Sequence, residues 1–184
     1  MNKLLSLVLA AAPIVCAQAP SDRGRERIER DVRKEILTLP FYGPYDWITF
    51  RVEGYHVTLS GMVSRPTLKA SAEQVTAKIE GVEGVTNEIE VLPLSPNDDR
   101  IRVATANAIF RHPAMTRYAI RGPNSPIHIL VRNGEVMLEG VVATESEKTI
   151  AGLQANGVSG VFKVTNNLAV ERPSVRKTKP KATK

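Results

Sequence analysis

The sequence predicts an α+β fold of two tandem αββαβ units, each a three-stranded mixed sheet with two helices on one face. The first observation is a repeat. Residues 52–63 and 131–142 share an alternating apolar pattern around a two-residue turn, and they lie 79 residues apart. The second observation is that residues 85–91 match residues 164–170 at the same spacing. A pattern repeated over this length indicates two copies of one structural unit.

The first unit is expected to begin with a helix over residues 22–39, which Pro40 ends. Apolar residues recur there at helical spacing. They are Ile28, Val32, Ile36 and Leu39. Strict alternation over 47–52 and 57–63 then predicts two strands of a hairpin with one apolar face.

A second helix is expected to open at Pro66 and to end at Gly81, because apolar residues again recur at helical spacing between them. Residues 85–91 are expected to form the third strand, with Val85, Ile89 and Val91 on one side. The apolar side chains of such a sheet point to one face, so both helices should cover that face.

The second unit repeats this order. Ser95 is the expected cap of a helix that runs to about Arg111. The Asn-Gly pair at 133–134 is typical of a type I′ hairpin turn, and residues 144–147 match a capping box for the next helix. Six extra residues between Pro113 and Ile127 are expected to form a loop.

The first seventeen residues have the features of a secretory signal: Lys3, an apolar run and small residues before Gln18. We expect cleavage after Ala17 or Ala19, which removes Cys16, the single cysteine. The alternative is a lipoprotein signal with Cys16 lipidated. The expected organisation is a signal at 1–17, domains at 24–93 and 96–171, and a disordered basic tail at 172–184.

The net charge of +6 comes from the tail. Six basic residues follow Glu171 with no acidic residue among them, and without these six and Lys3 the chain has 18 basic and 19 acidic residues. The folded units are therefore nearly neutral, and a nucleic-acid-binding domain is not indicated.

Both units resemble the BON domain. The residues that carry the resemblance are the glycine of each hairpin, the Gly-Val pair before each last strand and the asparagine within that strand. They are Gly61, Gly81, Val82 and Asn87, and then Gly140, Gly160, Val161 and Asn166. The resemblance implies an αββαβ fold, a periplasmic or outer-membrane-associated location, and binding to phospholipid membranes or envelope proteins without a reaction. Some relatives are thought to act as chaperones.

No enzymatic site, cofactor or metal site is predicted. His56, His112 and His128 lack metal-binding spacing, and Ser60 and Ser64 lack the context of a nucleophile. No small-molecule substrate is indicated, and the oligomeric state stays open. We expect Gly61 and Gly140 to mark a bulge or a closely packed helix.

Two surfaces are candidates for lipid or partner binding. Aromatic residues gather before and within the first hairpin, where they either pack around it or contact a membrane interface. The outer face of the second sheet is unusually apolar and is expected to meet the first unit, a lipid or another protein. Candidate contact residues are Phe41, Tyr42, Tyr45, Trp47, Leu130, Met137, Arg176, Lys177, Lys179 and Lys181.

The predicted function is binding of anionic phospholipid membranes by a non-enzymatic envelope protein, in envelope maintenance or osmotic stress. The tail would add electrostatic attraction to anionic headgroups or other envelope phosphates, or would only be a solubilising end. The alternative function is a periplasmic chaperone or adaptor for outer-membrane or secreted proteins.

Overall fold

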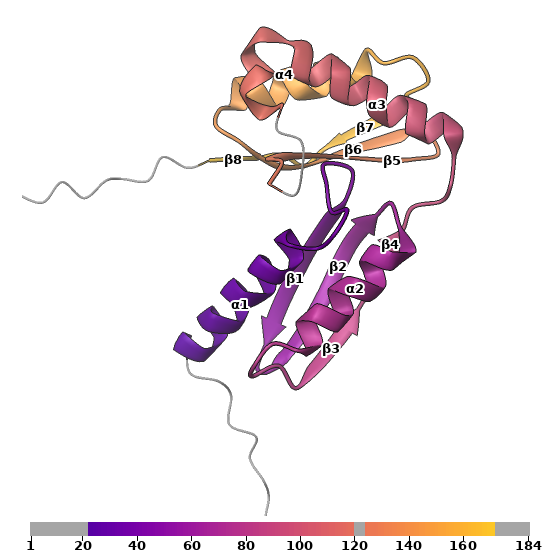
Figure 1. Cartoon of the computed structure of the whole chain (residues 1–184). Coiled ribbons are helices and arrows are strands. Elements are labelled where there is room, and N and C mark those ends of the chain that lie inside the picture. The colour runs from indigo at the N-terminus through magenta and orange to yellow at the C-terminus, as the bar shows by residue number, and fades with distance from the viewer. Residues whose placement is uncertain (1–21, 120–123, 172–184) are drawn as a thin grey trace, which may run out of the picture.

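A computed structural model describes residues 22–119 and 124–171 and confirms the predicted fold class (Figure 1). Two units of the same helix-strand-strand-helix-strand order follow one another. In each unit both helices lie on one face of the sheet. The expected signal segment, the basic tail and the tip of the inserted loop lie outside the described residues.

The first unit consists of α1 (Asp22–Leu37), β1 (Trp47–Glu53), β2 (His56–Val63), α2 (Pro66–Ala77), β3 (Gly84–Asn87) and β4 (Glu90–Val91). Strand β2 is central. It pairs antiparallel with β1 and parallel with β3 and β4, which follow one another along the same edge. The alternation of the hairpin places Ile48, Val52, Val57, Leu59 and Val63 in the core.

The second unit consists of α3 (Pro96–Arg111), the 3-10 helix η1 (Pro113–Tyr118), β5 (Ile127–Arg132), β6 (Glu135–Val142), α4 (Glu145–Asn156), β7 (Lys163–Asn166) and β8 (Ala169–Val170). Its register repeats that of the first unit, since Ile127 pairs with Gly140 as Ile48 pairs with Gly61. Ser95 caps α3, and a complete capping box opens α4, both as predicted.

The Asn133–Gly134 turn has the predicted type I′ character, because both residues have positive φ. A buried carboxylate also fixes this turn. Asp98, which is 1% exposed at the start of α3, accepts hydrogen bonds from the backbone N–H of Asn133 at 2.9 Å and of Gly134 at 2.8 Å. The first helix of the unit is therefore held against the tip of its hairpin.

Three details of the secondary-structure prediction are wrong. Helix α2 ends at Ala77 rather than at Gly81, and Ile79 lies in the following turn. The third strand is interrupted after Asn87, whose Oδ1 accepts a hydrogen bond from Ile89 N at 3.2 Å, and Val91 is consequently exposed. The segment after Pro113 is not simply a loop.

That inserted segment begins with η1, and its apolar side chains complete the core of the second unit. Met115 is fully buried and Tyr118 is 7% exposed. The Tyr118 hydroxyl donates to Glu147 at 3.0 Å and accepts from Ala143 N at 2.8 Å, and Arg117 forms an ion pair with Glu147. The insertion is thus joined to the beginning of α4.

The two strand glycines have a different explanation from the one predicted. Gly61 and Gly140 have φ of +120° and +118°, and a Cβ there would lie 2.1 Å from the carbonyl oxygen of Trp47 or Pro126 on the neighbouring chain segment. Neither a bulge nor a helix is responsible, since the β1–β2 register continues through Gly61. Glycine is needed because the adjacent backbone approaches so closely.

Candidate functional site at the junction of the two units

The first unit contacts the second through the loop before β1 and through the end of its sheet (Figure 1). Ile129 N on β5 donates to the carbonyl oxygen of Pro44 at 2.7 Å. Arg132 Nη1 forms an ion pair with Glu90 at 2.8 Å. A backbone hydrogen bond and an ion pair therefore join the edge of the second sheet to the first unit.

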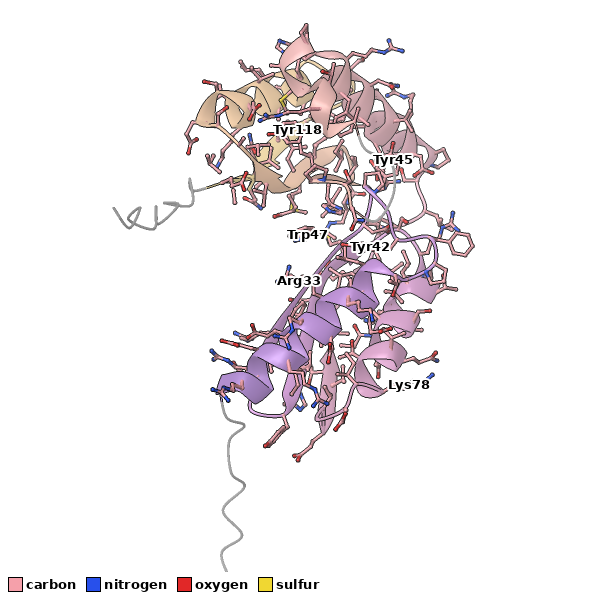
Figure 2. All side chains as sticks on the ribbon, turned by 60° about the vertical axis from the view of Figure 1, so that its left-hand side comes forward. Arg33, Tyr42, Tyr45, Trp47, Lys78 and Tyr118 are labelled. Atoms are coloured by element: carbon pink, nitrogen blue, oxygen red, sulfur yellow. The ribbon has the colours of Figure 1, made fainter. Side chains whose placement is uncertain are left out.

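Two of the aromatic residues predicted as contact residues, Tyr42 and Trp47, lie beside His128 of the second unit, and Figure 2 shows both of them near the junction. The His128 ring lies 4.8 Å from the Trp47 ring and 5.9 Å from the Tyr42 ring, measured between centroids. His128 is 4% exposed, and its Nδ1 has no hydrogen-bond partner among the described residues. Burial lowers the pKa of the imidazole, and this outweighs the neighbouring backbone groups and the Asp46 carboxylate, which favour protonation.

Asp46 holds the junction loop in place. Its carboxylate is buried and accepts hydrogen bonds from Ser64 N at 2.6 Å, Ser64 Oγ at 2.7 Å and Gly43 N at 3.2 Å. Tyr42 is also buried, and its hydroxyl accepts from Ile48 N at 3.4 Å. Burial raises the pKa of Tyr42 to about 12. Tyr42 therefore packs the hairpin and does not present its ring to a membrane in this conformation.

Tyr45 lies under a buried arginine of the second unit. The Arg102 Cζ is 5.9 Å from the Tyr45 ring centroid, Nη1 pairs with Asp99, and Nη2 donates to the Val131 carbonyl at 3.4 Å. Tyr45 lines two hollows. One, of about 610 Å³, runs along α3 beside Val103 and Phe110, and the other, of about 350 Å³, includes Arg65 and Leu94.

Phe41 differs from Tyr42, Tyr45 and Trp47 because it is 73% exposed. It has a φ of +67°, a left-handed conformation that is unfavourable for a bulky side chain. The Arg65 guanidinium lies 4.9 Å from its ring centroid and forms no ion pair with a described residue. Leu94, which shares a hollow with Arg65, is 96% exposed. We call Phe41, Arg65 and Leu94 the exposed apolar cluster.

The outer face of the second sheet is only partly accessible. Leu130 is 2% exposed, and it lies on β5 between His128 and Arg132, which both contact the first unit. Met137 is half-buried and Val141 is 46% exposed. The first unit therefore covers the β5 side of this face, as the sequence allowed, and the β6 side remains open to a partner.

Sequence reasoning placed Tyr42, Tyr45 and Trp47 in one cluster but missed the residues that organise it. His128 and Asp46 are close in space and distant in sequence, and no spacing pattern connects them. Arg65 was missed for the same reason. Arg176, Lys177, Lys179 and Lys181 lie outside the described residues. Gly81 and Gly160 both have positive φ in the turn before the last strand.

Within residues 22–119 and 124–171 no cluster of metal-binding side chains is found. In the same part of the chain, no helix is long and apolar enough to span a bilayer. The site consists of packed aromatic rings, buried charges and an exposed apolar cluster. The fold defines a protein of two consecutive αββαβ units.

The model of the BON domain family matches residues 24–93 and 114–172, and the chain belongs to this family. The second match begins after α3. The BON domain is generally a non-catalytic module of envelope proteins, which supports an envelope protein as the broad class.

Solved structures similar to this chain include two of the same protein. The C-terminal domain of CdsD, the structural protein of the type III secretion system of Chlamydia trachomatis, is 12% identical with a TM-score of 0.31, and the match covers 78% of this chain and 96% of that chain. A second structure of CdsD from the same organism is 11% identical with a TM-score of 0.27, and the match covers 78% of this chain and 92% of that chain. The search of curated proteins found no match.

Proposed function

We propose that this protein is a non-enzymatic periplasmic protein that binds anionic phospholipid membranes and serves envelope maintenance or osmotic stress. The observation that carries the proposal is Phe41. A bulky apolar side chain is held outward in an unfavourable backbone conformation, and residues in such conformations cluster at functional sites. Aromatic rings of this kind favour the boundary between headgroups and acyl chains.

The surroundings of Phe41 supply an apolar side chain and a cation, which are the two parts of a contact with an anionic membrane. Leu94 adds a second exposed apolar side chain, and Arg65 supplies a cation that no carboxylate of the described residues neutralises. An arginine at the level of the lipid phosphates beside inserted apolar side chains is the arrangement expected for interfacial binding. The six basic residues of the tail would contribute about 1 kcal/mol each when they lie near an anionic surface.

Flotation with vesicles tests this proposal. The mature chain is mixed with vesicles of phosphatidylcholine alone or with phosphatidylglycerol added. We expect binding to the anionic vesicles only, weakened by salt, by deletion of residues 172–184 and by Arg65→Ser. Arg30→Ser removes one exposed charge from α1 and serves as the matched control. Failure to bind vesicles of any composition would refute the proposal.

A second candidate function is an adaptor or chaperone for envelope proteins. The observation that favours it is the open part of the outer face of the second sheet, where Val141 and Met137 are accessible. Val141→Glu places a charge there without touching the buried Leu130. The adaptor function requires that the wild-type chain suppresses aggregation of an unfolded outer-membrane protein and that Val141→Glu does not. Equal suppression by both proteins would exclude this face.

A further inference from the structure

The outer edge of β1 is open, whereas the equivalent edge in the second unit is occupied. Phe50 pairs with Leu59 as Ile129 pairs with Leu138. The Ile129 N–H points away from β6, because it donates to Pro44. By this equivalence the Phe50 N–H points away from β2. No turn, loop or side-chain hydrogen bond of the described residues uses it.

The covering of β5 shows what the β1 edge lacks. The Pro44 carbonyl accepts from Ile129 N at 2.7 Å, and Ser125 Oγ donates to the Ile127 carbonyl at 2.8 Å. At the matching positions of β1 only Ile48 N has a partner, the Tyr42 hydroxyl at 3.4 Å. A sheet edge with free N–H and C=O groups is a template for an additional strand. Within residues 22–119 and 124–171 the chain thus covers the edge of β5 and leaves that of β1 free.

A groove accompanies the open edge. It has a volume of about 520 Å³ and is lined by every residue of β1 together with Arg25, Glu29 and Arg33 of α1. A smaller hollow of about 220 Å³ shares Arg33 and Phe50 with it and continues to the junction at His128. Figure 1 shows α1 running beside β1 over the length of the strand. A helix beside an open strand is the arrangement that receives an extended peptide through backbone hydrogen bonds.

The charges of the groove indicate the kind of segment that fits. Arg25 pairs with Glu29 at 3.7 Å, and Arg51 pairs with Glu53 at 3.1 Å. Arg33 has no carboxylate partner among the described residues, and its guanidinium lies 5.6 Å from the Phe50 ring centroid. An incoming segment with a carboxylate would neutralise this cation. The chain's own tail of lysines and arginines has the wrong charge.

We propose that the edge of β1 binds an extended segment of another protein as an additional strand, with an acidic side chain of that segment at Arg33. Backbone hydrogen bonds from Phe50 and Val52 supply the pairing, and the α1 side of the groove supplies selectivity for an acidic, β-prone sequence. This inference concerns a surface other than the exposed apolar cluster and does not depend on membrane binding.

The probe is the capped peptide Val-Thr-Val-Glu-Val-Thr-Val, added to the ¹⁵N-labelled mature chain. We expect the amide resonances of Phe50 and Val52 to shift and their hydrogen exchange to slow. The Ile129 amide should exchange slowly without peptide, because Pro44 already covers it. Trp47 is the single tryptophan and lines the groove, so its fluorescence reports the affinity. The same peptide with N-methylated backbone amides should not bind.

Arg33→Glu should weaken binding of the peptide about tenfold through charge repulsion. Arg30→Glu makes the same change on α1 outside the groove and should leave the affinity unchanged. The proposal is overturned if the peptide shifts no β1 amide at about 1 mM, or if N-methylated and unmodified peptides bind equally. It is also overturned if the β1 amides shift with protein concentration alone, since a second copy of the chain would then occupy the edge.

Discussion

Replacing Phe41 by asparagine should separate folding from membrane binding. Asparagine tolerates the left-handed conformation that phenylalanine adopts at φ +67°. Relief of this strain contributes about 1 kcal/mol, and loss of the contact with Arg65 costs about 0.5 kcal/mol. The free energy of unfolding of Phe41→Asn should therefore be equal to or slightly above that of the wild type. A functional residue, in contrast to a structural one, can be removed without loss of stability.

The same substitution should reduce vesicle binding substantially. A phenylalanine side chain buries about 200 Å², and Phe41 is 73% exposed, so about 150 Å² is available to the lipid. At about 25 cal/mol per Å² complete transfer would contribute about 4 kcal/mol. Insertion to the headgroup level realises roughly half of this. We therefore expect a loss of about 2 kcal/mol, or about 30-fold in the partition coefficient.

Binding is measured by co-sedimentation with vesicles that contain phosphatidylglycerol. The free energy of unfolding of the same proteins is measured by urea titration. Phe162→Asn is the matched control, because Phe162 is 83% exposed and packs on the Gly134 turn of the second unit. It should retain wild-type binding. Unchanged binding by Phe41→Asn would refute the argument, and so would an equal loss in both variants, which would indicate unspecific hydrophobic attraction.

Three further predictions concern stability. Gly140→Ala places a Cβ 2.1 Å from a backbone carbonyl oxygen and should lower the free energy of unfolding, measured in urea titrations, by about 3 kcal/mol or more. Gly43→Ala has open space around it and should change this free energy little. Asn166→Ala removes a side-chain hydrogen bond of 2.7 Å to Lys148 of α4 and one of 3.3 Å from Leu168 N, between β7 and β8, and should lower the free energy of unfolding by about 2 kcal/mol. Asn167→Ala, at an exposed position, should lower it by less than about 1 kcal/mol. Folding lowers the pKa of His128 below 6.5, so near that pH the unfolded state binds more protons than the folded state. The free energy of unfolding should therefore fall as the pH drops from 6.5 through the folded-state pKa. The total loss is about 1.4 kcal/mol for each pH unit that separates the two pKa values. A His128→Gln protein that kept this pH dependence in thermal unfolding would show that another group is responsible.

The repeat allowed the architecture of each unit to be predicted, because a hairpin with one apolar face and two amphipathic helices has few ways to close a core. Asn87 shows where this reasoning stops. Its amide donates to the Lys69 carbonyl at 2.9 Å while its Oδ1 accepts from Ile89, so one side chain both attaches the last strand to α2 and interrupts that strand. Strand propensity contains no information on such a bond, although the family pattern marked the asparagine.

The site was less predictable than the fold, since it depends on contacts between the units. The aromatic residues before the first hairpin lie in the loop at the junction of the units, but they occupy two different environments there. Tyr42 and Trp47 pack against His128, and Phe41 alone turns outward. Alternation and spacing describe a single element, whereas the burial of Tyr42 depends on the second unit and on Ile48 in the strand that follows.

The two units have diverged in what their equivalent surfaces contact. In the second unit, the edge of β5 and the adjacent outer face are occupied by the first unit, through Pro44, Trp47 and Glu90. In the first unit, no described residue covers the edge of β1 in this way, and the loop that covers β5 also carries Phe41. One loop therefore joins the units and presents Phe41 of the exposed apolar cluster. Protonation of His128 at the centre of this junction would loosen the loop, and with it the conformation of Phe41, so the docking of the units and the proposed membrane binding should both weaken as the pH falls.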